Sequence, residues 1–269
     1  MTTSPTSYTI RVDGHLDDHW AAWLGDLDIT CNGDGTSTLT ASIADQAQLH
    51  GVLAGLRDIG AVLIDLHATE PSAGQKRAAS RPVLEHSLVT ERLTLRAATT
   101  NDADLTWKFR QLAAVNEWLT GSPAELDGYR ELFTEPARLA TTVIVSLGHD
   151  PAAPVIGDFM LRRVDAWAQG EMTDQAKGAQ AELGGVLDPT HSGHGYATEA
   201  VRELLRYCFQ DLGVRRVTAN CFLDNDTSWR LMERVGMRRE THAIHESLHR
   251  SGQWLDTVGY ALLADEWRA

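Results

Sequence analysis

The pattern of hydrophobic and polar positions divides the chain into two segments. Residues 68–82, "ATEPSAGQKRAASRP", are small, polar and rich in Pro and Gly, which is typical of a linker. We therefore predict a small first domain over residues 1–70, a linker over residues 71–86 and a larger domain over residues 87–269.

The first segment alternates between strand and helix patterns. It predicts strands over residues 8–12 and 61–68, and helices over residues 16–25 and 44–60. Two further strands flank the turn Asn32–Gly35. The order βαββαβ predicts a small ferredoxin-like sandwich. This segment shows no catalytic constellation, so its role stays open.

The second segment predicts a mixed, mostly antiparallel sheet flanked by helices. A glycine pair, Gly184-Gly185, interrupts one of its strands and indicates a bulge or a close backbone approach. The predicted strands cover residues 88–99, 141–147, 154–164, 181–187, 215–222, 237–249 and 253–263, and the predicted helices cover residues 100–121, 127–133, 196–212 and 224–236.

A glycine-bearing loop, "DPTHSGHG", separates one strand from a long helical pattern. The apolar spacing after Gly195 buries one helix face, which leaves the N–H groups of the first turn unpaired at the positive end of the dipole. Glycines at 193 and 195 let an anion approach the backbone, so a pyrophosphate would fit there. The alternative is a tight turn that needs glycine for its geometry. The P-loop and dinucleotide patterns are both incomplete in this loop.

The stretch "HSGHGYATEAVRELLRYCFQDLGVRRVTANCFLDNDTSWRLMERVGM" resembles the coenzyme A-binding half of a GNAT-family N-acetyltransferase. It is most similar to the branch that acetylates the N-terminal amines of ribosomal proteins, and the resemblance covers about Leu88 to Trp267. Gly-Tyr-Ala-Thr-Glu-Ala, Asn225 with Ser228, and the closing Trp254 follow the family's order. Ser192 stands where the family often has Gln or Arg.

The resemblance implies a GNAT fold and direct transfer of an acetyl group from acetyl-CoA to an amine, with no metal. We expect Val186 to offer a backbone N–H to the oxyanion of the thioester. The residues that the resemblance assigns to the coenzyme are Val186, Leu187, Gly193, His194, Gly195, Tyr196, Ala197, Thr198, Asn225 and Ser228.

Direct transfer needs a proton acceptor for the amine and a donor for the thiolate. Glu182 is the first candidate for the acceptor and Glu246 the second, although a carboxylate at a strand end can simply face water. Ser228 is the candidate donor. Asn225 to Ser228 also opens a helix, so capping is the alternative role for these polar residues.

Two other functions compete with catalysis of acetyl transfer. "HESLH", His245 to His249, satisfies the zinc-peptidase pattern, and His242 stands three residues earlier. That pattern needs a helix, whereas we predict a strand, on which the two histidines would lie about 13 Å apart. The third possibility is a sensor that binds acetyl-CoA without turnover.

Composition narrows the choice of partners. The net charge is −13, and residues 1–70 carry ten acids and two bases, so nucleic acid is a poor partner and a cationic amine would be attracted. The same acidity also serves solubility.

No apolar run is long enough for a membrane span, and no secretory signal is expected. Cys31, Cys208 and Cys221 have no metal-type spacing and indicate reduced thiols in a cytoplasmic protein. Neither the identity of the amine nor the oligomeric state can be derived from the sequence.

Overall fold

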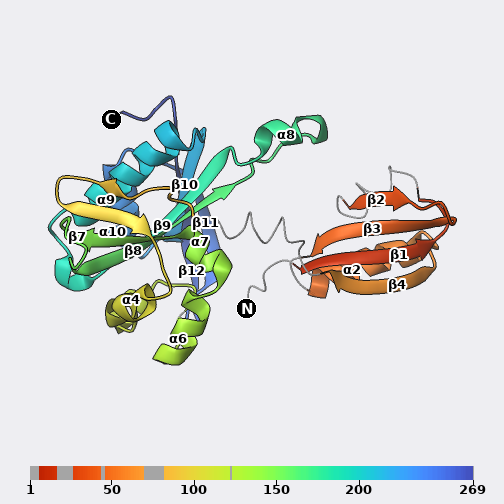
Figure 1. Cartoon of the computed structure of the whole chain (residues 1–269), viewed down its shortest axis with the longest axis horizontal. Coiled ribbons are helices and arrows are strands. Elements are labelled where there is room, and N and C mark those ends of the chain that lie inside the picture. The colour runs from red at the N-terminus through yellow and green to blue at the C-terminus, as the bar shows by residue number, and fades with distance from the viewer. Residues whose placement is uncertain (1–5, 17–26, 44–45, 70–81, 122, 269) are drawn as a thin grey trace. The chain divides into compact units, whose positions relative to one another are not determined.

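The computed structural model describes residues 6–16, 27–43, 46–69, 82–121 and 123–268. The chain divides into two compact units, Met1–Ala78 and Ala79–Ala269, each of which is described by itself (Figure 1). None of the helices in these described ranges is long and apolar enough to cross a membrane.

The first unit contains a four-stranded sheet with the order β2-β3-β1-β4, and all its neighbouring strands are antiparallel. This is the strand order of the predicted βαββαβ arrangement. The predicted helix over residues 16–25 lies almost wholly outside the described residues. The elements are β1 (Thr6–Asp13), β2 (Asp28–Cys31), β3 (Thr36–Ile43), α2 (Gln46–Asp58) and β4 (Leu63–Thr69).

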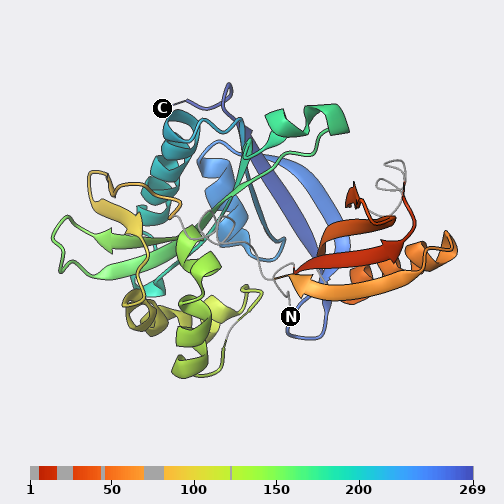
Figure 2. The same ribbon diagram turned by 45° about the vertical axis from the view of Figure 1, so that its right-hand side comes forward.

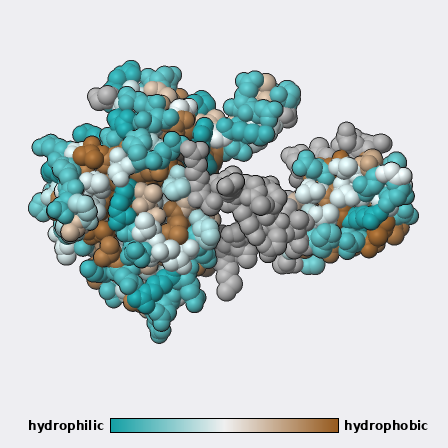
Figure 3. Space-filling model, in the orientation of Figure 1, coloured by the Kyte–Doolittle hydropathy of each residue, from teal (hydrophilic) through white to brown (hydrophobic). Residues whose placement is uncertain are grey.

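One face of this sheet is apolar and the other is polar. Leu49, Val52 and Leu56 of α2 are buried in one cluster with Ile10 and Leu39 of the sheet. The surface of the unit seen in Figure 3 is mainly white and teal, with brown at the edge formed by β4. The exposed aliphatic residues at that edge are Val62, Leu63 and Ile64.

The second unit is built on an eight-stranded sheet with the order β11-β12-β10-β9-β8-β7-β6-β5. Every neighbouring pair is antiparallel except β9 with β10. The long blue strands β11 and β12 run side by side in Figure 2. The strands are β5 (Leu88–Val89), β6 (Leu93–Ala97), β7 (Thr142–Leu147), β8 (Val155–Val164), β9 (Gln180–Leu187), β10 (Arg216–Phe222), β11 (Arg238–Leu248) and β12 (Trp254–Leu263).

Helices cover both faces of this sheet, and strand β7 shows why: its successive side chains point to opposite faces and are buried on both. Val143 and Val145 pack in the main core with the helix after the glycine loop, whereas Ile144 points to the opposite face and packs with Tyr129 and Phe133. The helices are α4 (Asp102–Arg110), α5 (Ala113–Asn116), α6 (Leu126–Phe133), α7 (Pro136–Thr141), α8 (Thr173–Ala176), α9 (Tyr196–Arg206) and α10 (Asp226–Arg234).

Three local predictions differ from the structure. The strand expected over residues 88–99 is two short antiparallel strands, β5 and β6. The helix expected over residues 100–121 breaks at Leu112, whose backbone is extended with ψ 134°. The predicted linker is also too long, because the N–H of Val83 donates to Ala140 O at 2.7 Å and Leu84 is buried in the main core.

Candidate active site

Strands β9 and β10 pair only at their beginnings and then diverge. Their parallel register joins Gln180–Glu182 to Arg216–Thr218, although β9 continues to Leu187 and β10 to Phe222. Along residues 183–187, strand β9 therefore pairs with β8 alone. The result is a gap lined by main-chain polar groups, to which an extended ligand can hydrogen-bond as an added strand would.

The register decides which peptide groups face this gap. The N–H of Asp188 donates to Ile156 O at 2.7 Å, and the register between β8 and β9 is continuous from there. Because hydrogen-bonding directions alternate along a strand, the main-chain groups of Val186 point at β8, and those of Gly185 and Leu187 point at the gap. This corrects the expectation that Val186 offers its N–H to an oxyanion, and it keeps Leu187 as a candidate.

The loop after β9 has the geometry expected of an anion site. Gly193 and Gly195 have φ of 81° and 80°, and Gly195 is the N-cap of α9 without a side-chain cap. The first helical hydrogen bond runs from Glu199 N to Gly195 O at 3.0 Å, so the N–H groups of residues 196–198 precede it. A Cβ on Gly193 would meet no atom within 4 Å, so a ligand has room to approach the backbone.

Two arginines at this loop were missed by the sequence reasoning. Arg92, just before β6, donates from Nη1 to His194 O at 3.0 Å and forms an ion pair with Glu199 at 2.6 Å. Arg234 of α10 is exposed and donates from Nη1 to Thr198 Oγ1 at 3.3 Å. Only the tertiary structure brings these cations to the loop, since Arg92 lies about a hundred residues away in the chain.

Asn225 and Ser228 lie beside the diverging half of β10. The side chain of Asn225 accepts from Ser228 N at 3.3 Å, which confirms that Asn225 is the N-cap of α10. Burial raises the pKa of the Cys221 thiol on β10, and a hydrogen bond with Ser228 partly offsets that rise. Ser228 is therefore a half-buried residue whose hydroxyl contacts the Cys221 thiol of β10, while Asn225 makes the cap.

Both candidate proton acceptors already have partners. Glu182 is on β9 opposite Arg162 of β8, whose Nε donates to Glu182 Oε2 at 3.1 Å. Glu246 of β11 accepts a hydrogen bond from the hydroxyl of Thr257 on β12. Either carboxylate would have to give up or share one of these hydrogen bonds in order to accept a proton from the amine.

The two histidines of the zinc-peptidase pattern lie on and just after strand β11, as predicted. His245 Nδ1 lies 3.2 Å from Trp254 O, and His249 Nε2 lies 2.8 Å from Glu117 O. The N–H of Ser251 donates to the other ring nitrogen of His249 at 3.3 Å. The described residues contain no group of three or more His, Cys, Asp or Glu that could hold a metal ion. The two histidines thus lie on strand β11 and directly after it, whereas the zinc-peptidase pattern needs them on a helix.

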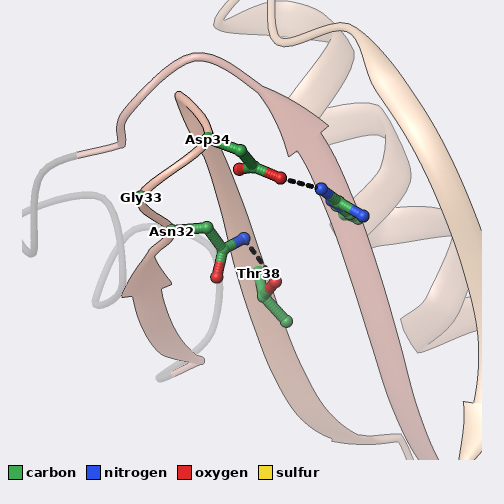
Figure 4. A pocket seen from close by; sticks show the side chains of 5 residues that line it. Asn32, Gly33, Asp34 and Thr38 are labelled. Carbon is green, nitrogen blue, oxygen red and sulfur yellow. Dashed lines mark hydrogen bonds and ion pairs between the residues drawn. The ribbon is translucent and has the colours of Figure 1, made fainter.

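A polar pocket of the first unit lies at the turn between β2 and β3 (Figure 4). It is lined by Arg11, Asn32, Gly33, Asp34 and Thr38. The guanidinium of Arg11 contacts the carboxylate of Asp34, and the amide of Asn32 donates to Thr38 Oγ1 at 2.8 Å. Because these groups satisfy one another, the pocket presents no reactive side chain.

The chain is similar to known acetyltransferases. Residues 92–238 match the acetyltransferase (GNAT) domain family, and residues 7–67 match a domain of unknown function, DUF8691. The chain is 36% identical over 86 residues to the uncharacterized N-acetyltransferase YnaD of Bacillus subtilis, which covers 32% of this chain and 50% of YnaD. It is 27% identical over 186 residues to the uncharacterized N-acetyltransferase p20 of Bacillus licheniformis, which covers 67% of this chain and 98% of p20. The chain thus spans about half the length of the Bacillus subtilis relative.

Solved structures share the fold of the second unit. A GNAT-family acetyltransferase from Bacillus anthracis is 25% identical, with a TM-score of 0.57, and the match covers 67% of this chain and all of that one. RimJ of Mycobacterium smegmatis, solved with CoA-disulfide, is 20% identical with a TM-score of 0.52, over 66% and 84% of the two chains. The ribosomal-protein-S5-alanine acetyltransferase of Vibrio fischeri is 16% identical with a TM-score of 0.53, over 69% and 100%. The predicted fold and resemblance are confirmed, and the chain belongs to the GNAT acetyltransferase family.

Proposed function

We propose that the second unit is an N-acetyltransferase that moves the acetyl group of acetyl-CoA directly to an amine. The observation that carries this proposal is the open edge of β9, which leads straight into the uncapped N-terminus of α9. A thioester carrier needs both features, because its pantetheine arm resembles a peptide and its diphosphate is an anion. Membership of the GNAT family supports the same class of enzyme and the same co-substrate.

The diphosphate would bind to the N–H groups of residues 193–198, and the pantetheine arm would lie along Gly185 and Leu187. The side chain of Asn225, at the N-terminus of α10, would form the border of the coenzyme site on that side. A gap-facing N–H of β9 would stabilise the oxyanion as the amine nitrogen attacks the carbonyl carbon. The C–S bond then breaks, and the hydroxyl of Ser228 passes its proton to the thiolate while it takes up the proton that the attacking nitrogen releases.

The amine must lose a proton to become a nucleophile, and we assign its acceptance to Glu182, with Glu246 as the second choice. Glu182→Gln should lower kcat by about 100-fold or more if it is the base. The same change should leave the dissociation constant of CoA unaltered. A variant with full kcat would transfer the role to Glu246, which Glu246→Gln tests in the same assay.

The acceptor is an amine, and we propose a cationic one in the cytoplasm, such as a protein N-terminus or a polyamine. The net charge of −13 supports this choice, because a negative field concentrates cations near the protein. The three cysteines are free, which agrees with a reducing compartment.

Calorimetry with CoA, followed by an acceptor panel monitored by mass, tests the proposal. We expect CoA binding and a mass gain of one acetyl group on at least one amine. Binding without turnover on any amine would identify a sensor instead. Zinc-dependent cleavage of peptides would establish the hydrolase, and no CoA binding by folded protein would end the proposal.

A further inference from the structure

Arg92 contacts the loop before α9, although it lies about a hundred residues earlier in the sequence. Its Nε donates to Glu199 Oε2 at 2.7 Å, its Nη2 lies 2.6 Å from the same oxygen, and its Nη1 donates to His194 O at 3.0 Å. All three nitrogens of the guanidinium thus already have a protein acceptor. Three of its five N–H groups are thus directed at acceptors of the loop and of α9, so the side chain is placed to organise the loop.

Glu199 presents a problem for an anion site at this position. It stands in the first turn of α9, and its side chain is 17% exposed. Burial raises the pKa of this carboxyl, but hydrogen bonds from Thr90 and Arg92 outweigh burial and hold the pKa below its ordinary value. Glu199 is therefore ionised at neutral pH, and its charge opposes a diphosphate at the same helix end.

The same arginine also contacts the residues that shape the loop. Its guanidinium carbon lies 4.7 Å from the centroid of the Tyr196 ring, a cation–π contact. Its Nη2 is 3.6 Å from the place where a Cβ of Gly195 would stand. Arg92 therefore contacts the loop carbonyl, the first helical residue and the first-turn carboxylate together.

We propose that Arg92 is a positioning residue of the coenzyme site. Its positive charge compensates that of Glu199, and its hydrogen bond to the His194 carbonyl fixes the direction of that carbonyl. The N–H groups of residues 193–198 can then face the ligand without an opposing charge. This inference rests on the proposed function, since it concerns how tightly the coenzyme is held. It assigns Arg92 no contact with the reacting atoms.

Three variants distinguish this positioning role from a general effect on stability. Arg92→Gln should raise the dissociation constant of CoA and the KM for acetyl-CoA by tenfold or more, with kcat within threefold. The double variant Arg92→Gln with Glu199→Gln should recover most of the lost affinity, because no uncompensated carboxylate remains. Arg96→Gln is the matched control: it removes an arginine of β6 that pairs with Asp102, and it should leave CoA affinity unaltered.

Hydrogen exchange in the free protein provides a readout that needs no coenzyme. Amides of residues 193–199 should exchange faster in Arg92→Gln than in the unaltered protein and in Arg96→Gln. Unchanged exchange together with unchanged CoA affinity would overturn the inference, as would a double variant as weak as Arg92→Gln. Failure of the unaltered protein to bind CoA would instead overturn the proposed function, and the exchange result would still show whether Arg92 orders the loop.

Discussion

Gly185 of β9 lies directly against the ring of Phe159 on β8. A Cβ on Gly185 would come within 2.2 Å of Phe159 Cδ1, whereas a Cβ on the neighbouring Gly184 would meet only Met160 Cε at 3.7 Å. Of the two possibilities left open for the glycine pair, close approach holds at Gly185, and the register with β8 runs through both glycines without a bulge. The aromatic ring packs against the strand that borders the gap.

Gly185→Ala should therefore destabilise the protein by about 1–3 kcal/mol through overpacking, and it should weaken CoA binding because β9 must shift away from β8. Gly184→Ala is the matched control and should change both quantities far less. Urea unfolding and calorimetry with CoA measure the two effects. Equal effects of the two variants would refute the packing explanation.

The buried ion pair between Arg110 of α4 and Asp158 of β8 fixes that helix to the sheet. Arg110 Nε donates to Asp158 Oδ1 at 2.9 Å, and the side chains are 14% and 3% exposed. Asp158→Ala should cost about 3–5 kcal/mol of unfolding free energy, because it leaves the guanidinium buried and unpaired. Asp104→Ala, which removes one of the two carboxylate partners of the exposed Arg130, should cost much less. Similar losses in urea unfolding would contradict the argument.

Asp102 should make the stability of the protein sensitive to acid. Burial raises the pKa of its carboxyl, but hydrogen bonds from Arg96 and Thr99 outweigh burial and lower the pKa below its ordinary value. A depressed pKa in the folded state stabilises above the unfolded value of about 3.9, and this contribution is lost as the pH falls through the folded pKa. The stability gap between the protein and Asp102→Asn should thus be largest near pH 7 and shrink below about pH 4. Urea unfolding across this range measures it, and a constant gap would disprove it.

Asn225 and Ser228 should separate capping from catalysis. Asn225→Ala removes the cap of α10 and should cost about 1 kcal/mol of stability. Ser228→Ala should leave stability nearly unaltered, because its hydroxyl is not the cap, but should lower kcat at least tenfold if that hydroxyl protonates the thiolate. Thermal unfolding and steady-state kinetics distinguish the two. A Ser228→Ala enzyme with normal kcat would leave Ser228 no part in proton transfer.

Local patterns were sufficient to predict most elements and the glycine-bearing turn before α9. The apolar spacing of α9 and the glycines at 193 and 195 are short-range features, because helix burial and left-handed turns depend on residues within a few positions of one another. The strand order of the first unit also followed from the order of its elements. The strand over residues 238–248 could also be predicted from its local pattern.

Pairings between distant residues could not be predicted in this way. The contact of Arg92 with Glu199 depends on how α9 packs against the sheet. The ion pair of Glu182 with Arg162 and the direction of the Val186 peptide depend on the register between β8 and β9. A shift of one residue would reverse which groups face the gap, and that choice becomes fixed only when β9 pairs with β8. The uncapped backbone before α9 could therefore be predicted from short-range chemistry, whereas the charges around it and the peptide groups that face the gap were set by contacts across the folded sheet.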